Sequence, residues 1–200
     1  MSELEICTLL SDGRLIRSGD LEIYGLYRIS LISLVEQGIL FSPSWGVYLR
    51  SDVSRSPLFD VAVLSLRIPI GIWGLETALR IHLGHYENLS LWMRLPKGKK
   101  RYPTISEYEL SFVSRAESMF SCGLASTNVH GIDVRYTDFA NTVAECCVFR
   151  NRIGIDVFLT ALKAYMTSDA FDGSYFDEVC RLHRVQQVIL PYMQSIRGLL

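Results

Sequence analysis

The stretch SLISLVEQGILFSPSWGVYL, residues 30–49, decides how the N-terminal part of the chain folds. Its first half carries apolar residues at helical spacing and ends at Gly38, a residue type that commonly terminates helices. Two short β-like runs follow, ILFS and GVYLR, on either side of the segment around Pro43. The stretch therefore predicts a helix over about 27–37, followed by a β-hairpin.

The residues before this stretch predict two more short helices. ELEICTLLS, residues 3–11, has helical spacing, and Ser18 is suited to cap a helix over residues 19–25. LIR, residues 15–17, predicts a short extended piece. Three short helices and a two-stranded ribbon are typical of a winged helix-turn-helix, whose third helix enters the major groove of DNA. A generic helical subdomain with a hairpin would give the same pattern, so both interpretations stay open here.

The rest of the chain predicts an α+β domain. SDVSRSP, residues 51–57, is polar and indicates a linker. Beyond it we expect a helix that stops before Pro69 and a β-hairpin with its turn at His130 and Gly131. The other expected elements are a helix over 73–84, strands over 90–96 and 108–114, and helices over 138–150, 155–167, 174–184 and 185–197.

The predicted fold class is therefore α+β, in two domains joined by a linker. Residues 1–50 form the winged helix-turn-helix and residues 51–57 the linker. Residues 58–200 form an α+β domain with a small antiparallel sheet and C-terminal helices.

Composition excludes several functional classes. Net charge is −1, so no basic field covers the whole protein. Five cysteines without a CxxC motif argue against a disulfide framework and a thiolate zinc site, and we expect no metal and no cofactor. GxSxG and P-loop motifs are absent, so we expect no enzyme activity. No signal peptide or membrane span is predicted, which indicates a cytoplasmic protein without a membrane partner.

Several segments resemble one protein family, with their spacing preserved from about residue 4 to 196. They are GDLEIYGLYRISLISLVEQGIL (19–40), WGVYLR (45–50), DVAVLSLRIPIGIWGLETALRIHLG (60–84), LWMRLPKGKKR (91–101) and GIDVRYTDFANTVAECCVFRNRIGIDVFLTALKAY (131–165). The chain resembles the AbiEi-type antitoxins of type IV toxin–antitoxin systems. That resemblance implies an antitoxin that is also a DNA-binding transcriptional autorepressor. Its implied partners are operator DNA and a nucleotidyltransferase-like toxin.

The chain departs from the family pattern at two positions, the first of which bears on DNA binding and the second of which is a mild change. Trp45 stands where the wing usually carries an arginine, and Glu145 stands where the family often has aspartate. Residues 1–50 hold four basic and six acidic residues, although phosphate neutralisation supplies much of protein–DNA affinity. The alternative is a protein-interaction module whose winged helix no longer binds DNA.

Two groups of residues are the candidate sites. The third helix exposes its DNA-reading side chains if Ile29, Leu31, Leu34 and Val35 face inward. The predicted DNA contacts are Tyr27, Arg28, Ser30 and Ser33 on that helix, Arg17 and Arg50 as phosphate contacts, and Trp45 at the wing tip. Trp45 can equally face a protein partner or fold back onto the core. The second group is either a basic patch that binds nucleic acid or an acidic partner, or a loop that is merely solvated. Its residues are Arg94, Lys97, Lys99, Lys100 and Arg101.

Overall fold

The computed structural model describes residues 13–22, 28–87, 90–98 and 105–198. The predicted helix over 3–11 lies outside this range. The chain divides into two compact units. Unit 1 comprises Met1–Ile70 and Ser126–Val134, and unit 2 comprises Gly71–Ala125 and Arg135–Leu200. This division does not fall at the predicted linker, because the helix after the linker and the tip of a later hairpin both belong to unit 1.

Unit 1 contains a three-stranded antiparallel sheet with strand order β1-β3-β2. Leu31 and Leu34 are buried against Ile16, Leu40 and Tyr48, so the helix packs on the sheet through its apolar stripe. The elements of unit 1 are β1 (Ile16–Arg17), α2 (Ser18–Glu22), α3 (Arg28–Glu36), β2 (Leu40–Ser44), β3 (Val47–Arg50) and α4 (Phe59–Arg67). The expected hairpin and the helix that stops before Pro69 are both present.

The tip of a second hairpin ties separate segments of unit 1 together. His130 and Gly131 both have positive φ, 50° and 75°, as a tight two-residue hairpin turn requires. His130 Nε2 accepts a hydrogen bond from Ser56 N at 3.0 Å. Its Nδ1 therefore carries the proton and donates to Gly13 O, also at 3.0 Å. The imidazole also packs edge-on against Phe59, so one side chain holds the residues that flank β1 and α4.

The second sheet has five strands in the order β6-β5-β4-β8-β7. Pairing is antiparallel between β4 and β5 but parallel between β5 and β6 and between β4 and β8. The sheet is thus mixed, whereas we had expected it to be antiparallel. Long connections make this possible, since parallel neighbours cannot be joined by a tight turn. The strands are β4 (Ile72–Trp73), β5 (Leu91–Pro96), β6 (Leu110–Arg115), β7 (Leu124–Val129) and β8 (Ile132–Thr137).

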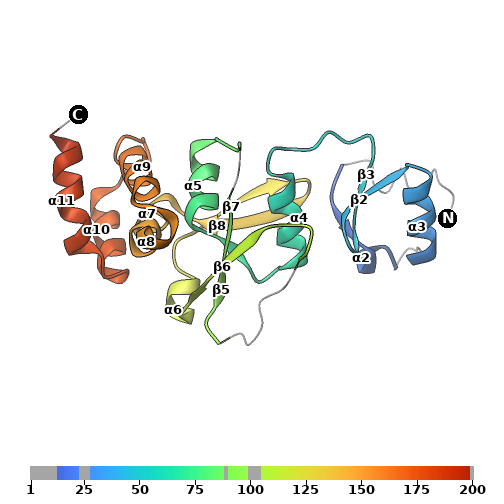
Figure 1. Ribbon diagram of the computed structural model, residues 1–200, viewed down its shortest axis with the longest axis horizontal. Helices are drawn as coiled ribbons and strands as arrows, with labels where there is room; N and C mark the ends of the chain where they lie inside the picture. Colours follow the sequence, from blue (N-terminus) through green and yellow to red (C-terminus); the bar gives the residue numbers. More distant parts are fainter. Residues whose placement is uncertain (1–12, 23–27, 88–89, 99–104, 199–200) are drawn as a thin grey trace. The chain divides into compact units, whose positions relative to one another are not determined.

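The C-terminal helices of unit 2 lie close together (Figure 1), and their buried side chains form an aromatic core. Phe158, Tyr165 and Phe176 are buried there. Tyr165 packs edge-on against Phe176, and Phe158 packs edge-on against Tyr192. The described helices of unit 2 are α5 (Leu75–Leu83), α6 (Glu117–Phe120), α7 (Phe139–Val148), α8 (Arg150–Ile153), α9 (Ile155–Met166), α10 (Gly173–Leu182) and α11 (Gln186–Arg197). The helix predicted over 73–84 ends as expected, at Gly84 in the left-handed conformation.

Candidate nucleic-acid interface

Helix α3 places two of its predicted contact residues on or near the surface. Ser30 is exposed, and Ser33 is half-buried with its Oγ accepting a hydrogen bond from Gln37 Nε2 at 3.0 Å. Tyr27 lies outside the described residues. Arg28 begins α3, but its side chain is likewise outside the described part of the chain.

The expectation that Ile29 faces inward is wrong. Its side chain is 84% exposed, and Ile32 is 45% exposed on the same helix. Leu31 and Leu34 already occupy the inward stripe, and a residue two positions before Leu31 lies about 200° away from it around the helix axis. An apolar residue close to the stripe in sequence therefore ends on the outer face.

The two predicted phosphate contacts are engaged with neighbouring carboxylates. Arg17 Nε lies 3.2 Å from Asp20 Oδ2, and Arg50 Nε donates to Asp52 Oδ1 at 2.7 Å. The hydrogen bond from Arg50 lowers the pKa of Asp52, so that carboxylate stays charged beside the guanidinium. Both arginines are thus locally neutralised.

The wing turn between β2 and β3 projects Trp45 outward and is held in place by α4. Arg67 Nη1 donates to Ser44 Oγ at 2.8 Å and to Trp45 O at 2.6 Å. Its guanidinium also lies 6.0 Å from the centre of the indole ring. The Trp45 residue is 69% exposed, so its ring is not folded back onto the core.

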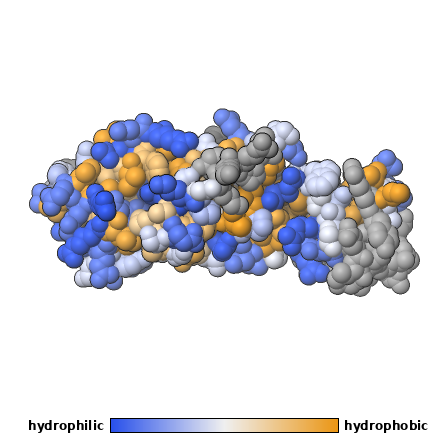
Figure 2. Space-filling view, turned by 90° about the horizontal axis from the view of Figure 1, so that it is seen from below, coloured by the Kyte–Doolittle hydropathy of each residue, from blue (hydrophilic) through white to orange (hydrophobic). Residues whose placement is uncertain are grey.

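Ile32 and Trp45 share the wall of a shallow hollow on unit 1. The hollow has a volume of about 230 Å³ and is lined by Ile32, Val35, Glu36, Ser42, Trp45, Gly46 and Tyr48. Hydrophobic atoms reach the surface at the right-hand edge of Figure 2, the side on which α3 lies in Figure 1. The outer face of α3 and the wing turn therefore form one apolar surface, with Ile29 next to Ile32 on the helix.

Arg94, the first residue of the predicted basic patch, does not lie at the surface. Arg94 is completely buried, on a strand that lies between two others, and its Nη2 donates to the carbonyl oxygens of Met119 and Phe120. These carbonyl groups belong to α6, and Glu145 on α7 lies on the same guanidinium, so the two helices bury this arginine in the core. Lys97 is exposed, while Lys99, Lys100 and Arg101 lie outside the described residues.

Glu145 is the centre of a buried charged cluster that the sequence did not predict. Its Oε1 lies 2.8 Å from Arg115 Nε and 3.4 Å from Arg94 Nε. Burial lowers the pKa of Arg94, and the nearby Glu145 charge opposes that shift. The three side chains come from β5, β6 and α7, so no local pattern in the sequence could have revealed their contact.

Polar side chains linked by hydrogen bonds lie at the start of α7. Asp138 caps the helix by accepting from Asn141 N at 2.8 Å, and Tyr175 Oη donates to Asp138 Oδ2 at 2.6 Å. His183 Nε2 donates to Asn141 Oδ1 at 3.0 Å. Burial, with the nearby positive charges of Arg115 and Arg94, lowers the pKa of His183 to about 3, so the imidazole is neutral at physiological pH.

The described cysteines form no disulfide, and the described residues form no metal site. Cys122, Cys146, Cys147 and Cys180 are free, and burial raises the pKa of the last three thiols, which keeps them protonated. No group of three or more His, Cys, Asp or Glu in the described chain is placed to hold a metal ion. Among the described helices, none is long and apolar enough to cross a lipid bilayer.

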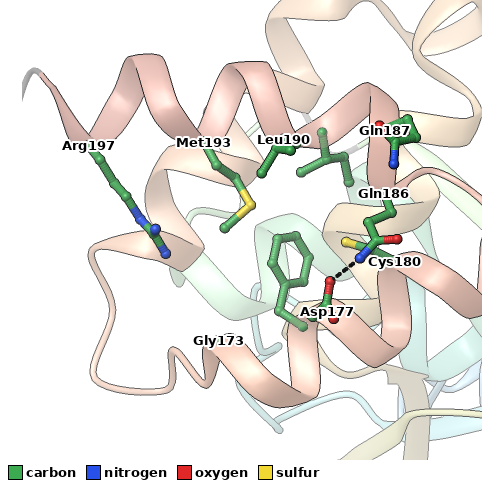
Figure 3. A pocket seen from close by; sticks show the side chains of 10 residues that line it. Gly173, Asp177, Cys180, Gln186, Gln187, Leu190, Met193 and Arg197 are labelled. Atoms are coloured by element: carbon green, nitrogen blue, oxygen red, sulfur yellow. Dashed lines mark hydrogen bonds between the residues drawn. The ribbon is translucent and has the colours of Figure 1, made fainter.

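A second hollow, of about 280 Å³, lies between α10 and α11 (Figure 3). Phe176, Ile189 and Met193 give it apolar walls, and Gln186 donates to Asp177 at one side. Cys180 lines it too, with a thiol pKa raised by burial to about 12. The hollow therefore offers a place for apolar contact but no reactive group.

Comparison with known proteins gives no match, either to a protein-family model or to a curated protein.

Proposed function

We propose that this chain is a type IV, AbiEi-like antitoxin and transcriptional regulator whose unit 1 binds operator DNA as a winged helix-turn-helix and represses its own operon. The observation that carries the proposal is the element order β1–α2–α3–β2–β3 combined with the strand order β1-β3-β2. A helix-turn-helix uses its second helix to enter the major groove, and α3 holds that position before the hairpin.

In this proposal, unit 2 is the part that counters a nucleotidyltransferase-like toxin in the cytoplasm. The support is the resemblance of segments 60–84, 91–101 and 131–165 to the antitoxin family. We assign unit 2 no reaction of its own.

The electrostatics of unit 1 set the expected strength of DNA binding. Among the described residues, Arg17 and Arg50 are the candidate contacts for DNA phosphates. To bind DNA, each must leave its aspartate and pair with a phosphate instead. Counterion release gives a slope of about −0.9 per neutralised phosphate in a plot of log affinity against log salt, so two contacts predict a slope of about −2 per protomer. Binding should therefore depend on salt only moderately.

The test is a mobility-shift titration of the full-length protein against the DNA upstream of its own gene. An unrelated duplex serves as the control, at low and at moderate salt. We expect a specific shift with the moderate salt dependence given above. No shift at low salt would contradict DNA binding and favour the alternative, a protein-interaction module.

Arg28→Ala sharpens this test, because the sequence places Arg28 at the start of α3. Loss of a base-reading arginine should weaken operator binding by about 1–3 kcal/mol. Arg197→Ala is the matched control, since it removes the same charge from an exposed position at the end of α11 in unit 2. Equal affinities for the two variants would remove Arg28 from the interface.

A further inference from the structure

We propose that the outer face of α3 selects thymine, with Ile29 contacting the 5-methyl group of the base in the major groove. This inference rests on the DNA-binding function proposed above and names the base that the same site prefers. It starts from the unexpected exposure of Ile29, which is 84%.

The exposed apolar residues of unit 1 form a group. Ile29 and Ile32 lie three positions apart on α3 and are therefore neighbours on one helix face. Ile32 in turn shares a hollow with Trp45. A grouped apolar surface of this kind indicates a contact site, whereas single exposed apolar residues do not.

The size of this group favours a base contact over a protein interface. A stable protein–protein interface buries roughly 800 Å² on each partner, whereas one large aromatic side chain buries only about 150–250 Å². Two isoleucines and one tryptophan supply less than the first figure. A thymine methyl group, in contrast, needs only one apolar side chain in van der Waals contact.

The chemistry of the major groove identifies the base. Thymine is the only base that presents a methyl group there, and an apolar side chain recognises it. Cytosine presents an amino donor and guanine presents two acceptors, and an isoleucine would desolvate these groups without bonding to them. Ile29 at the groove therefore discriminates against both.

The polar side chains next to Ile29 on α3 are less suited to selecting a base. Ser30 is exposed, but a hydroxyl both donates and accepts and distinguishes bases weakly. The Ser33 hydroxyl already accepts a hydrogen bond from Gln37. Ile29, in contrast, is a large apolar side chain with 84% of its surface exposed.

The experiment uses deoxyuridine, which differs from thymidine only by the missing methyl group. Duplexes preferred by the full-length protein are first selected from a randomised duplex library. Each thymidine of a selected duplex is then replaced singly by deoxyuridine. Affinity is measured for the wild type, for Ile29→Ala and for the control Ile155→Ala, which makes the same change at an exposed position on α9.

We expect one or two replacements to weaken wild-type binding about fourfold, the equivalent of about 0.8 kcal/mol per buried methyl group. In Ile29→Ala the same replacements should have no effect, while Ile155→Ala should behave like the wild type. Circular dichroism should give the same helix content for all three proteins, because both isoleucines are exposed.

Three results would overturn the inference, and they can be told apart. If no duplex is preferred, the proposed function fails and the inference fails with it. If a duplex is preferred but uracil and thymine bind equally at every position, the inference alone fails. If Ile29→Ala binds the selected duplex as tightly as the wild type, the inference also fails, because Ile29 then contributes no contact to the DNA.

Discussion

Arg17 and Arg50 in unit 1 meet carboxylates three and two residues away along the chain, at the protein surface. Arg94 and Arg115 in unit 2 instead meet Glu145, a residue distant in sequence, inside the core. Surface pairs contribute about 0–1 kcal/mol and exchange partners easily, whereas breaking a buried pair costs about 3–5 kcal/mol. The arginines of unit 1 therefore remain available to a ligand such as phosphate, and those of unit 2 are part of the fold.

The largest predicted effect comes from removing the central charge of the buried cluster. Glu145→Gln leaves Arg94 and Arg115 without their counter-charge in a site where the glutamate side chain is 0% exposed. We expect the free energy of unfolding to fall by about 3–5 kcal/mol. Urea denaturation followed by circular dichroism measures this loss.

Glu178→Gln is the control for that experiment, because Glu178 is exposed on α10. It should change the free energy of unfolding by less than about 0.5 kcal/mol. A loss below about 1 kcal/mol for Glu145→Gln would show that the buried charges find other compensation, and the contrast between the two units would disappear.

A smaller effect should appear on acidification, through His183. Its pKa is about 3 in the folded protein and about 6.5 when unfolded, so the folded state disfavours protonation. Stability is unaffected by this group above pH 6.5 and falls as the pH drops below that value. Between pH 7 and pH 5 the expected loss is about 2 kcal/mol.

The variant His183→Gln isolates this contribution, because glutamine can still donate to Asn141 Oδ1 but does not titrate. Unfolding curves at pH 7 and pH 5 should show a smaller stability loss in the variant than in the wild type. Part of the loss should remain, since burial also lowers the pKa of His82. Equal losses in both proteins would exclude His183 as the source.

The smallest effect on stability is expected for Asp20→Asn in unit 1. The Arg17–Asp20 pair is about half exposed, so the free energy of unfolding should change by no more than about 1 kcal/mol. Operator affinity should increase, because Arg17 no longer has a competing carboxylate. The salt dependence should stay near a slope of about −2, because the number of phosphates contacted does not change.

Asp169→Asn provides the matched charge change at an exposed residue of unit 2. Mobility shifts at two salt concentrations compare the two variants. The same gain in affinity for both would mean that only the total charge matters, and the local pairing of Arg17 would be irrelevant to binding.

Local signals in the sequence predicted most helices and strands. Pro69 and Gly84 end helices where expected, because each acts on its own backbone. The turn at His130 and Gly131 likewise depends on two adjacent residues with positive φ. Such features need no knowledge of distant parts of the chain.

Burial of individual side chains was harder to predict. Arg94 stands three residues before a lysine-containing loop, and its sequence neighbours suggested a solvated patch. Its burial depends on contacts distant in sequence, with Met119 and Phe120 on α6 and with Glu145 on α7. Ile29 was misplaced for a related reason, since only the packed sheet defines which face of α3 is inward.

The His130 turn has a consequence for the order in which the chain folds during synthesis. Unit 1 takes in Ser126–Val134, and His130 binds the backbone at Gly13 and Ser56. Although domains commonly fold in order as they leave the ribosome, the N-terminal unit of this protein must wait until residue 134 has emerged. Nascent chains arrested before that point should therefore remain more sensitive to protease in residues 13–70 than the finished protein.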